Sequence, residues 1–382
     1  MKLAFLVGSG ISIDAGMPCV ADVSDQVFSG RNAVRHSDAT YYIVADAAVP
    51  AYDAHRPELD AAVALTNRFR EMADEYFAVC SPDHRPNYED VANLAKQVGD
   101  AISGEYENAA LSPLLAGLRK ELGADAQDLM ERAVEAHNYI QDMVWGLLSR
   151  PVTGVAHLRA ITDACGALGR VDLFDLNHDV VLERALTDHG VSVSDGFGAA
   201  DGDVRWWDDC FNEPVRHFKL HGSIRWFRRA RPTQEWRGSV VARSTTNDPD
   251  HERSASGELL DAPVDGRPAI LVGTFDKPLA YDTSVHADQH FHFYKSLRRA
   301  ERLVVVGYGF ADKGVNNRVI GWLGKSRDHR LVVVHGDEEA LLAGARPAIK
   351  SKWFRWREEG RLRVLPRWVA DATWDEIQAA CA

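Results

Sequence analysis

Short runs of apolar residues recur along the chain and end at glycine or a polar residue. The first run, residues 3–7, reads Leu-Ala-Phe-Leu-Val and stops at Gly8. An apolar run this short and unbroken is typical of a central parallel strand that helices cover on both faces. We expect further strands at residues 171–176, 215–220, 268–272, 303–306 and 331–334. Several are followed by Gly or Asn and then a plausible helix, as in a doubly wound α/β sheet.

The segment between the first two predicted strands differs, because its apolar residues recur at helical spacing. Three stretches in it favour helices: residues 58–79, 88–98 and 125–148. At roughly 160 residues the segment is too long for one βαβ crossover, which needs roughly a dozen or more. We therefore expect a helical insertion module at residues 25–155, inside a Rossmann-like core formed by residues 1–24 and 156–382.

Composition and charge narrow the class of protein. The 382 residues suggest two domains, or one large domain with an insertion. Hydrophobic residues make up 46% and charged residues 26%, which is typical of a soluble globular protein and argues against disorder. With 44 basic and 56 acidic residues the net charge is −12, so most of the surface should repel nucleic acid. No apolar run approaches the roughly 18–20 residues that span a bilayer, so we expect no membrane segment.

The five cysteines are widely spaced, at Cys19, Cys80, Cys165, Cys210 and Cys381. None belongs to a C-x-x-C pair, which excludes a structural zinc ribbon and a thioredoxin motif. We expect reduced thiols in a cytoplasmic protein and no bound metal.

The first predicted strand runs into a glycine-rich loop, residues 8–12, which reads Gly-Ser-Gly-Ile-Ser. Glycine lets the backbone approach a ligand closely, and a helix beginning here would present free N–H groups to a phosphate. The strict dinucleotide fingerprint needs a third glycine where this chain has Ile13. The alternative is a tight strand-to-helix turn that holds no ligand.

Two further predicted strands end in polar residues suited to chemistry. The strand at 171–176 is followed by Asn177, His178 and Asp179. Asn177 can orient a water or a ribose hydroxyl, and Asp179 can accept a hydrogen bond from an amide. Either residue could instead only cap the next helix. The following strand ends at His221, which is either a general base near neutral pH or a satisfied turn histidine.

A fourth strand end carries Gly307 and Gly309 on either side of Tyr308, with Asn316 shortly after. A ribose could press against backbone there, although glycines at strand ends are common. In an open α/β sheet the carboxyl ends of the strands border the ligand crevice, which favours a site at this edge.

Taken in order, the four segments resemble the sirtuin-like NAD-binding fold, over residues 1–20 and about 168–335. Each segment alone is ambiguous, whereas the four in this order are specific. Residues 8–12 and 16–18 resemble the sirtuin Gly-Ala-Gly-Ile-Ser and Gly-Ile-Pro, and residues 177–179 stand where sirtuins carry Gln-Asn-Ile-Asp. Residues 221–222 match the sirtuin His-Gly. Residues 307–310 resemble the sirtuin Gly-Thr-Ser-Leu, and they are closer still to the Gly-Tyr-Ser-Phe of bacterial sirtuin-like NADases.

Departures from the sirtuin pattern indicate the subclass. Sirtuin deacylases carry a four-cysteine zinc module between their His-Gly and Gly-Thr-Ser motifs, and here that interval has no cysteine. The Asp-Phe-Arg after the sirtuin proline is replaced by Cys-Val-Ala at residues 19–21, which weakens a deacylase interpretation. Residues 219–226, Lys-Leu-His-Gly-Ser-Ile-Arg-Trp, resemble the bacterial antiviral members, and so do residues 88–91.

The resemblance implies an NAD+ glycohydrolase, which splits NAD into nicotinamide and ADP-ribose and depletes it in bacterial antiphage defence. It implies catalytic roles for Asn177 and His221. It implies contacts with the substrate NAD at Gly8, Ser9, Gly10, Ser12, Asp14, Asp179, Gly307, Tyr308, Gly309 and Asn316. The chain ends about 50 residues after its last core strand, so we expect no sensor domain. A compact chain of this kind resembles the sirtuin-like subunit that pairs with a HerA-like hexameric ATPase, and we expect a homo-oligomer.

Three other functions stay open: an NAD-dependent protein deacylase, a non-catalytic NAD or ADP-ribose sensor, and a nucleic-acid module. The last would use the basic stretch 216–243, which is interleaved with Trp226 and Phe227 and could otherwise be a solvated loop or a partner interface. Residues 228–267 are rich in Arg, Ser, Asp and Pro and predict an irregular excursion. Trp368, near the end, is expected to pack against the core or a neighbouring subunit.

Overall fold

The computed structural model describes residues 2–45, 54–81, 84–106, 108–230, 239–246, 248–273 and 284–382. The chain divides into two compact units. The sheet unit comprises residues 1–17, 151–271 and 278–382, and the helical unit comprises residues 18–150 and 272–277. No helix within the described ranges is long and apolar enough to cross a membrane.

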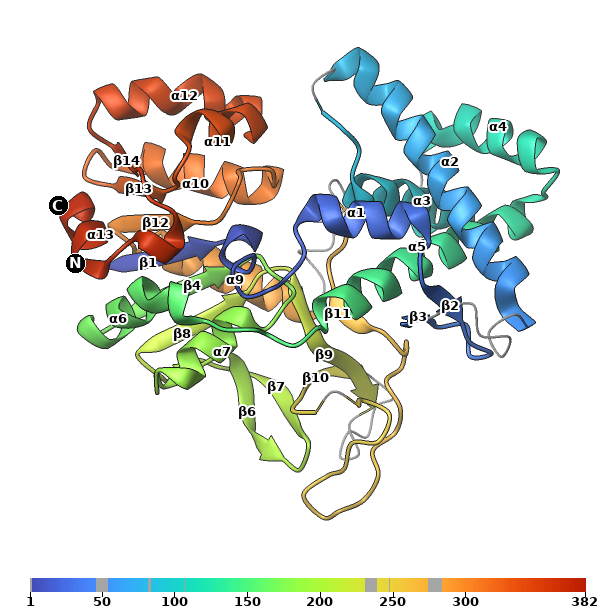
Figure 1. The fold of residues 1–382 in the computed structure, drawn as a ribbon, viewed down its shortest axis with the longest axis horizontal. Coiled ribbons are helices and arrows are strands. Elements are labelled where there is room, and N and C mark those ends of the chain that lie inside the picture. The colour runs from blue at the N-terminus through green and yellow to red at the C-terminus, as the bar shows by residue number, and fades with distance from the viewer. Residues whose placement is uncertain are drawn as a thin grey trace. The chain divides into compact units, whose positions relative to one another are not determined.

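A seven-stranded parallel sheet forms the centre of the sheet unit, in the order β14-β13-β12-β1-β4-β8-β5 (Figure 1). Its strands are β1 Leu3–Val7, β4 Val171–Asp175, β5 Val193–Ser194, β8 Val215–Lys219, β12 Arg302–Val306, β13 Arg330–Val334 and β14 Leu362–Leu365. This sheet confirms the predicted class, a Rossmann-like doubly wound α/β fold. It includes the strands predicted at residues 3–7, 171–176, 215–220, 303–306 and 331–334.

Helices cover both faces of the sheet, which explains the unbroken apolar runs. They are α6 Arg159–Ala167, α7 Val181–Asp188, α9 Ser284–Leu297, α10 Lys313–Lys325, α11 Glu338–Gly344, α12 Pro347–Glu358 and α13 Trp374–Cys381. In β1, the side chains of Leu3, Phe5 and Val7 pack with α6, α7 and α13. Ala4 and Leu6 pack on the opposite face with α9, α10 and α12. Successive residues of a strand point to opposite faces, and both faces of β1 are covered, so every position of β1 is apolar.

The order of strands reverses at β1. The chain places β4 and β8 on one side of β1, and it later places β12, β13 and β14 on the other. In doubly wound sheets the carboxyl ends of the strands at such a point border the ligand crevice. The segments that follow β1, β4, β8 and β12 are therefore neighbours in space.

A second, antiparallel sheet corrects two predictions. Its strands, in the order β11-β9-β10-β7-β6, are β6 Gly196–Asp201, β7 Val204–Cys210, β9 Gly222–Ala230, β10 Ser239–Ser244 and β11 Pro268–Ile270. The run at 268–272 pairs antiparallel with β9 as an edge strand, where the missing N–H of proline is tolerated. The irregular excursion predicted for 228–267 is wrong where β9 pairs with β10, because charged residues of these strands find carboxylate partners, as Arg229 does in Glu252.

The helical unit holds the three predicted helices. Its elements are α1 Val20–Ser29, β2 Ala33–Arg35, β3 Tyr41–Ile43, α2 Arg56–Cys80, α3 Tyr88–Ser103, α4 Ser112–Leu122 and α5 Ala126–Leu148. α3 begins where it does because the Asn87 side chain accepts hydrogen bonds from the N–H groups of Glu89 and Asp90. α5 begins after Asp125, whose carboxylate caps it in the same way. The predicted extent of an insertion module, residues 25–155, stays a prediction.

Candidate functional site

The segments after β1, β4 and β12 are joined by hydrogen bonds at the carboxyl edge of the parallel sheet. The side-chain amide of Asn177, after β4, donates to the hydroxyl oxygen of Ser12 (3.3 Å). The N–H of Gly10 donates to the carbonyl oxygen of Gly307, after β12 (2.9 Å). Asn177 and Ser12 are both buried. The structure thus brings together three of the four segments singled out in the sequence.

His221 connects the fourth segment to this group. Its Nδ1–H donates to the carbonyl oxygen of Leu176, at the end of β4 (3.1 Å). Its Nε2 lies 3.2 Å from Oδ2 of Asp312, beyond the end of β12. The contacts among the four segments therefore form a closed ring, which passes through the buried His221 side chain.

Asp312 is the residue that sequence reasoning left without a role. Its Oδ1 caps α10 by accepting a hydrogen bond from the N–H of Val315 (2.9 Å), which leaves Oδ2 toward His221. The carboxylate fixes the orientation of the imidazole, and a proton taken up by Nε2 gains a negative partner. An acidic residue three positions after a strand-end Gly-x-Gly is the signal that could have found it.

The loop after β1 turns sharply and does not begin an α-helix. Ser9–Ile11 form one 3-10 turn, and α1 begins only at Val20, in the helical unit. The N–H groups of Gly8, Ile11 and Ser12 donate to carbonyl oxygens at the sheet edge. The predicted helix start is wrong here, because the Gly-Met-Pro that follows the loop favours a turn and extended backbone. No α-helix begins at this loop, so it offers no helix N-terminus to a phosphate. The contacts of Gly8, Ser9, Gly10 and Ser12 with NAD stay predictions.

Gly307 is needed for backbone packing between β1 and β12. Its φ is +66°, and a Cβ atom there would lie 2.6 Å from the Ile11 nitrogen and 2.9 Å from the Gly8 oxygen. We expect Gly307→Ala to lower the free energy of unfolding by about 2–3 kcal/mol, because an L side chain is strained at this φ and the backbone must shift. Chemical denaturation measures this. Gly309→Ala is the matched control, because a Cβ at Gly309 meets nothing within 4 Å; an equal loss in both variants would contradict the packing role.

Asp179 is a carboxyl group buried at the same edge. Its Oδ1 accepts a hydrogen bond from the N–H of Val181 (2.9 Å), and the Ser12 hydroxyl also bonds to it. Burial raises the pKa of Asp179 to about 6, the charge of Asp175 adds to the rise, and Lys219 opposes it. A carboxyl group with this pKa is ionised at neutral pH and becomes neutral in mild acid. The position of Asp179 is thus compatible with both roles that the sequence left open, capping the next helix and binding a ligand.

The remaining predicted contact residues divide into exposed and internally bonded groups. Ser9, Asp14 and Gly309 are exposed. The Tyr308 hydroxyl donates to Oδ1 of Asn316 (2.9 Å), and the Asn316 amide donates to the carbonyl oxygen of Phe310 (2.8 Å). Tyr308 and Asn316 therefore hold the turn between β12 and α10, and their ligand roles stay predictions.

One face of α9 brings buried polar side chains beside His221. His286, Gln289 and His290 share this face because they are spaced i, i+3 and i+4. The Nε2 of His290 donates to the carbonyl oxygen of Leu220 (3.0 Å). Burial lowers the pKa of His286 to about 3 and that of His290 to about 2, and the nearby His221 adds to both shifts. This face of α9, which sequence analysis missed, is therefore polar and uncharged.

Gln289 is fully buried, and neither its amide oxygen nor its amide nitrogen has a hydrogen-bond partner in the part of the chain that the structure describes. An unpaired buried amide costs about 1–3 kcal/mol. We expect Gln289→Leu to raise the free energy of unfolding by about 1 kcal/mol, as measured by urea denaturation. Gln378→Leu, on the exposed surface of α13, is the control and should change it by less than about 0.5 kcal/mol. Destabilisation by Gln289→Leu would show that the amide is satisfied in solution.

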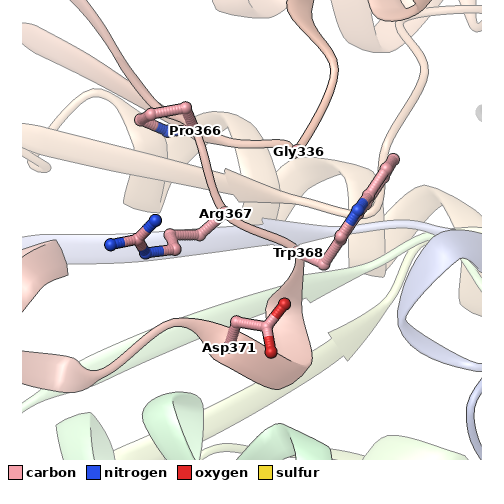
Figure 2. A pocket seen from close by; sticks show the side chains of 5 residues that line it. All are labelled: Gly336, Pro366, Arg367, Trp368 and Asp371. Atoms are coloured by element: carbon pink, nitrogen blue, oxygen red, sulfur yellow. The ribbon is translucent and has the colours of Figure 1, made fainter.

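A pocket of about 440 Å³ lies at the ends of β13 and β14 (Figure 2). Its lining residues are Gly336, Pro366, Arg367, Trp368 and Asp371. The Trp368 ring packs over Gly336, where a Cβ would lie 2.4 Å from it, yet 54% of the residue is exposed. Trp368 thus packs in part against its own unit, and its packing against a neighbouring subunit stays a prediction. The pocket offers an aromatic face and a guanidinium at the same sheet edge as His221.

The basic stretch 216–243 is largely neutralised inside the sheet unit. Arg216 forms two hydrogen bonds of 2.7 Å with Asp172, and Arg229 contacts Glu252 at 2.8 Å. Trp226 and Phe227 are buried, so they offer no stacking surface. Residues 231–238 lie outside the described ranges. The described part of the stretch gives no support to a nucleic-acid module, and it is not a solvated loop.

One cluster near the site has the ligand types of a metal centre. Ligand atoms of Asp175, Glu183 and His217 lie within 4.8 Å of one another, and no other such group occurs among the described residues. The ammonium group of Lys219 lies among them, 3.1 Å from Asp175 and 3.2 Å from Glu183. The three ligand residues are spread over three elements, so no local sequence motif indicates the cluster.

No family model matches the sequence, and no curated protein matches it. The chain is similar to a mutant Sir2 homologue in complex with ADP-ribose, at 12% identity and a TM-score of 0.38, with 99% of this chain and 91% of that chain covered. It is also similar to a Sir2 homologue–NAD complex, at 15% identity and a TM-score of 0.37, covering 99% and 88%. Similarity this distant does not define a family, and the assignment to the Rossmann-like α/β proteins rests on the chain's own parallel sheet.

Proposed function

We propose that the chain is an NAD+ glycohydrolase. The observation that carries this proposal is the closed ring of contacts among the four motif segments, in which His221 is one link. Two residues whose side chains can activate or orient water, Asn177 and His221, lie at the edge where doubly wound sheets bind ligands. The resemblance of the same segments to sirtuin-like NAD sites supports NAD as the substrate.

The reaction breaks the bond between ribose C1 and the nicotinamide nitrogen, and forms a bond from C1 to the oxygen of water. Nicotinamide leaves as a neutral molecule with the electron pair of the broken bond, so positive charge develops on the ribose. His221 takes the proton that the water loses, and Asp312 faces the resulting imidazolium. Asn177 orients the water or a ribose hydroxyl. Asp179, ionised at neutral pH, accepts a hydrogen bond from the carboxamide.

In the cell, this activity would deplete NAD in bacterial antiphage defence, under the control of a HerA-like ATPase partner and as a homo-oligomer. The resemblance of residues 219–226 to the antiviral members supports this assignment. Cytoplasmic location follows from the same role, because the NAD pool lies there. A binding experiment between the purified chain and a HerA-like ATPase tests the partner.

A protein deacylase and a non-catalytic sensor are the competing functions. All five cysteines are free, and Cys165 and Cys381 are buried in the sheet unit, which argues against a four-cysteine zinc module. The pairing of His221 with Asp312 argues against a pure sensor, since binding alone needs no proton acceptor.

One experiment separates the three functions. The purified chain is incubated with NAD, with and without an acetyl-lysine peptide, and products are followed by mass spectrometry. A glycohydrolase consumes NAD at the same rate in both, a deacylase only with the peptide, and a sensor binds NAD without consuming it. Consumption that depends on the peptide would overturn the proposed function.

A further inference from the structure

The side chain of Lys219 is a buried cation between β4, β8 and α7. It is 3% exposed and lies at the carboxyl end of β8. Its ammonium nitrogen is 3.1 Å from Oδ2 of Asp175 in β4 and 3.2 Å from Oε1 of Glu183 in α7. It also donates to the main-chain carbonyl oxygen of Asp179, at 2.6 Å. One side chain thus reaches three different segments.

The buried carboxylate of Asp175 and the partly buried carboxylate of Glu183 balance the buried ammonium. Burial alone would lower the pKa of Lys219, but the charges of Asp175, Glu183 and Asp179 outweigh it and raise this pKa. Burial alone would raise the pKa of Asp175, but Lys219 and His217 lower it to about 2. Lys219 and Asp175 are therefore both charged at neutral pH. The ammonium group of Lys219 supplies the positive charge that a metal ion would otherwise bring to Asp175, Glu183 and His217.

The same cluster holds both ends of the segment that carries the candidate site. Oδ1 of Asp175 accepts a hydrogen bond from the N–H of Asn177 (2.9 Å), while its Oδ2 contacts Lys219. Lys219 holds the carbonyl oxygen of Asp179, two residues further on. The backbone of Asn177–Asp179 is thus fixed on each side of His178.

We propose that Lys219 is a positioning residue, an internal cation that holds Asn177 and Asp179 in place for the reaction. This inference rests on the proposed function. Lys219 does not touch the reacting atoms; it acts through Asp175 and through the carbonyl group of Asp179.

A purely structural role, tying β4 to β8, is the alternative, and the protein provides a control for it. Arg216 in β8 forms two hydrogen bonds of 2.7 Å with Asp172 in β4. This buried pair joins the same two strands three residues earlier and has no bond to residues 177–179 among the contacts described. Arg216→Met and Lys219→Met therefore each remove an ion pair between β4 and β8. Arg216→Met also removes a hydrogen bond to Ser296 of α9 (2.8 Å), but only Lys219→Met releases the site segment.

The experiment compares the kinetics and the stability of the two variants. Lys219→Met should lower kcat for NAD at least about 30-fold, whereas Arg216→Met, at a similar loss of thermal stability, should lower it less than about 3-fold. Lys219 and Asp175 are the charged groups that act on the Asp179 carboxyl. Loss of Lys219 should therefore move the acid limb of the kcat/KM profile to higher pH, and Arg216→Met should leave it in place. Equal kcat losses with an unmoved limb in both variants would overturn the proposal.

If Lys219→Met does not fold, a second variant, Lys219→Arg, provides the test. Lys219→Arg keeps the charge but changes its geometry, so it should leave the acid limb unmoved while kcat falls several-fold. A folded Lys219→Arg variant with unchanged kcat would overturn the positioning role.

A binding measurement tests the role of Lys219 separately from the proposed NAD hydrolysis. If the wild type leaves NAD intact, the role of Lys219 is measured by calorimetry with NAD as the titrant. Lys219→Met should then weaken binding at least about 10-fold and Arg216→Met less than about 3-fold. Equal affinities in the two variants would overturn the proposal independently of catalysis.

Discussion

His221→Ala should lower the rate of NAD cleavage at least about 100-fold while leaving the protein folded. General acid–base groups contribute about 10²–10⁴-fold to rates, and His221 is the buried base candidate joined to Asp312 and to the end of β4. The rate is followed by chromatographic detection of nicotinamide. Thermal unfolding checks that the fold survives.

His329→Ala is the matched control for this variant. His329 also bonds a main-chain carbonyl through Nδ1, that of Trp322 (2.7 Å), but it precedes β13 and lies at the opposite, amino edge of the sheet. It should retain activity within about 3-fold. Wild-type turnover by His221→Ala would remove His221 from the mechanism.

Asp179→Asn should make the protein more stable at pH 7 and less active. The ordinary carboxyl pKa of 3.8 rises to about 6 in the fold, chiefly through burial. The folded protein therefore binds this proton more tightly than the unfolded chain does. Protonated Asp179 therefore stabilises the fold. This contribution is fully present below pH 3.8 and is lost as the pH rises through 6. Since asparagine does not ionise, the variant avoids this loss, which amounts to about 3 kcal/mol at pH 7.

Urea denaturation at several pH values measures this effect. The difference in unfolding free energy between Asp179→Asn and the wild type should be small near pH 4, grow up to pH 6 and stay constant above it. In the wild type, kcat/KM should fall below about pH 6, because the neutral carboxyl no longer accepts a hydrogen bond from the carboxamide. A difference that does not change with pH would mean that Asp179 titrates normally.

The parallel sheet was predictable because it follows from local patterns. Leu3–Val7 is apolar at every position, and an unbroken apolar run of this length is typical of a strand covered on both faces. The positions of Asn177 and His221 at one edge followed from the rule that parallel strands share their carboxyl ends. Residues 268–272 show the limit of the pattern, because an apolar run does not specify which sheet it joins or in which direction it pairs.

The support for the site was less predictable, because it depends on contacts between residues distant in sequence. Asp312 and His221 are brought together by the pairing of β1 with β12 and β4. Lys219 looked like part of a basic stretch, and only the fold shows that its charge is buried against Asp175 and Glu183. The helix start predicted in the loop after β1 was wrong for a different reason. Glycines that could approach a phosphate also allow close backbone packing, as Gly8 and Gly10 do against Gly307.

The most direct test of the central claim is the stoichiometry of NAD cleavage. The purified chain, alone and with a HerA-like ATPase, is incubated with NAD, and NAD, nicotinamide and ADP-ribose are quantified by mass spectrometry. We predict that NAD disappears in at least one condition, with nicotinamide and ADP-ribose formed in equal amounts, and that Asn177→Ala forms neither. NAD that stays intact in both conditions would contradict the proposed function.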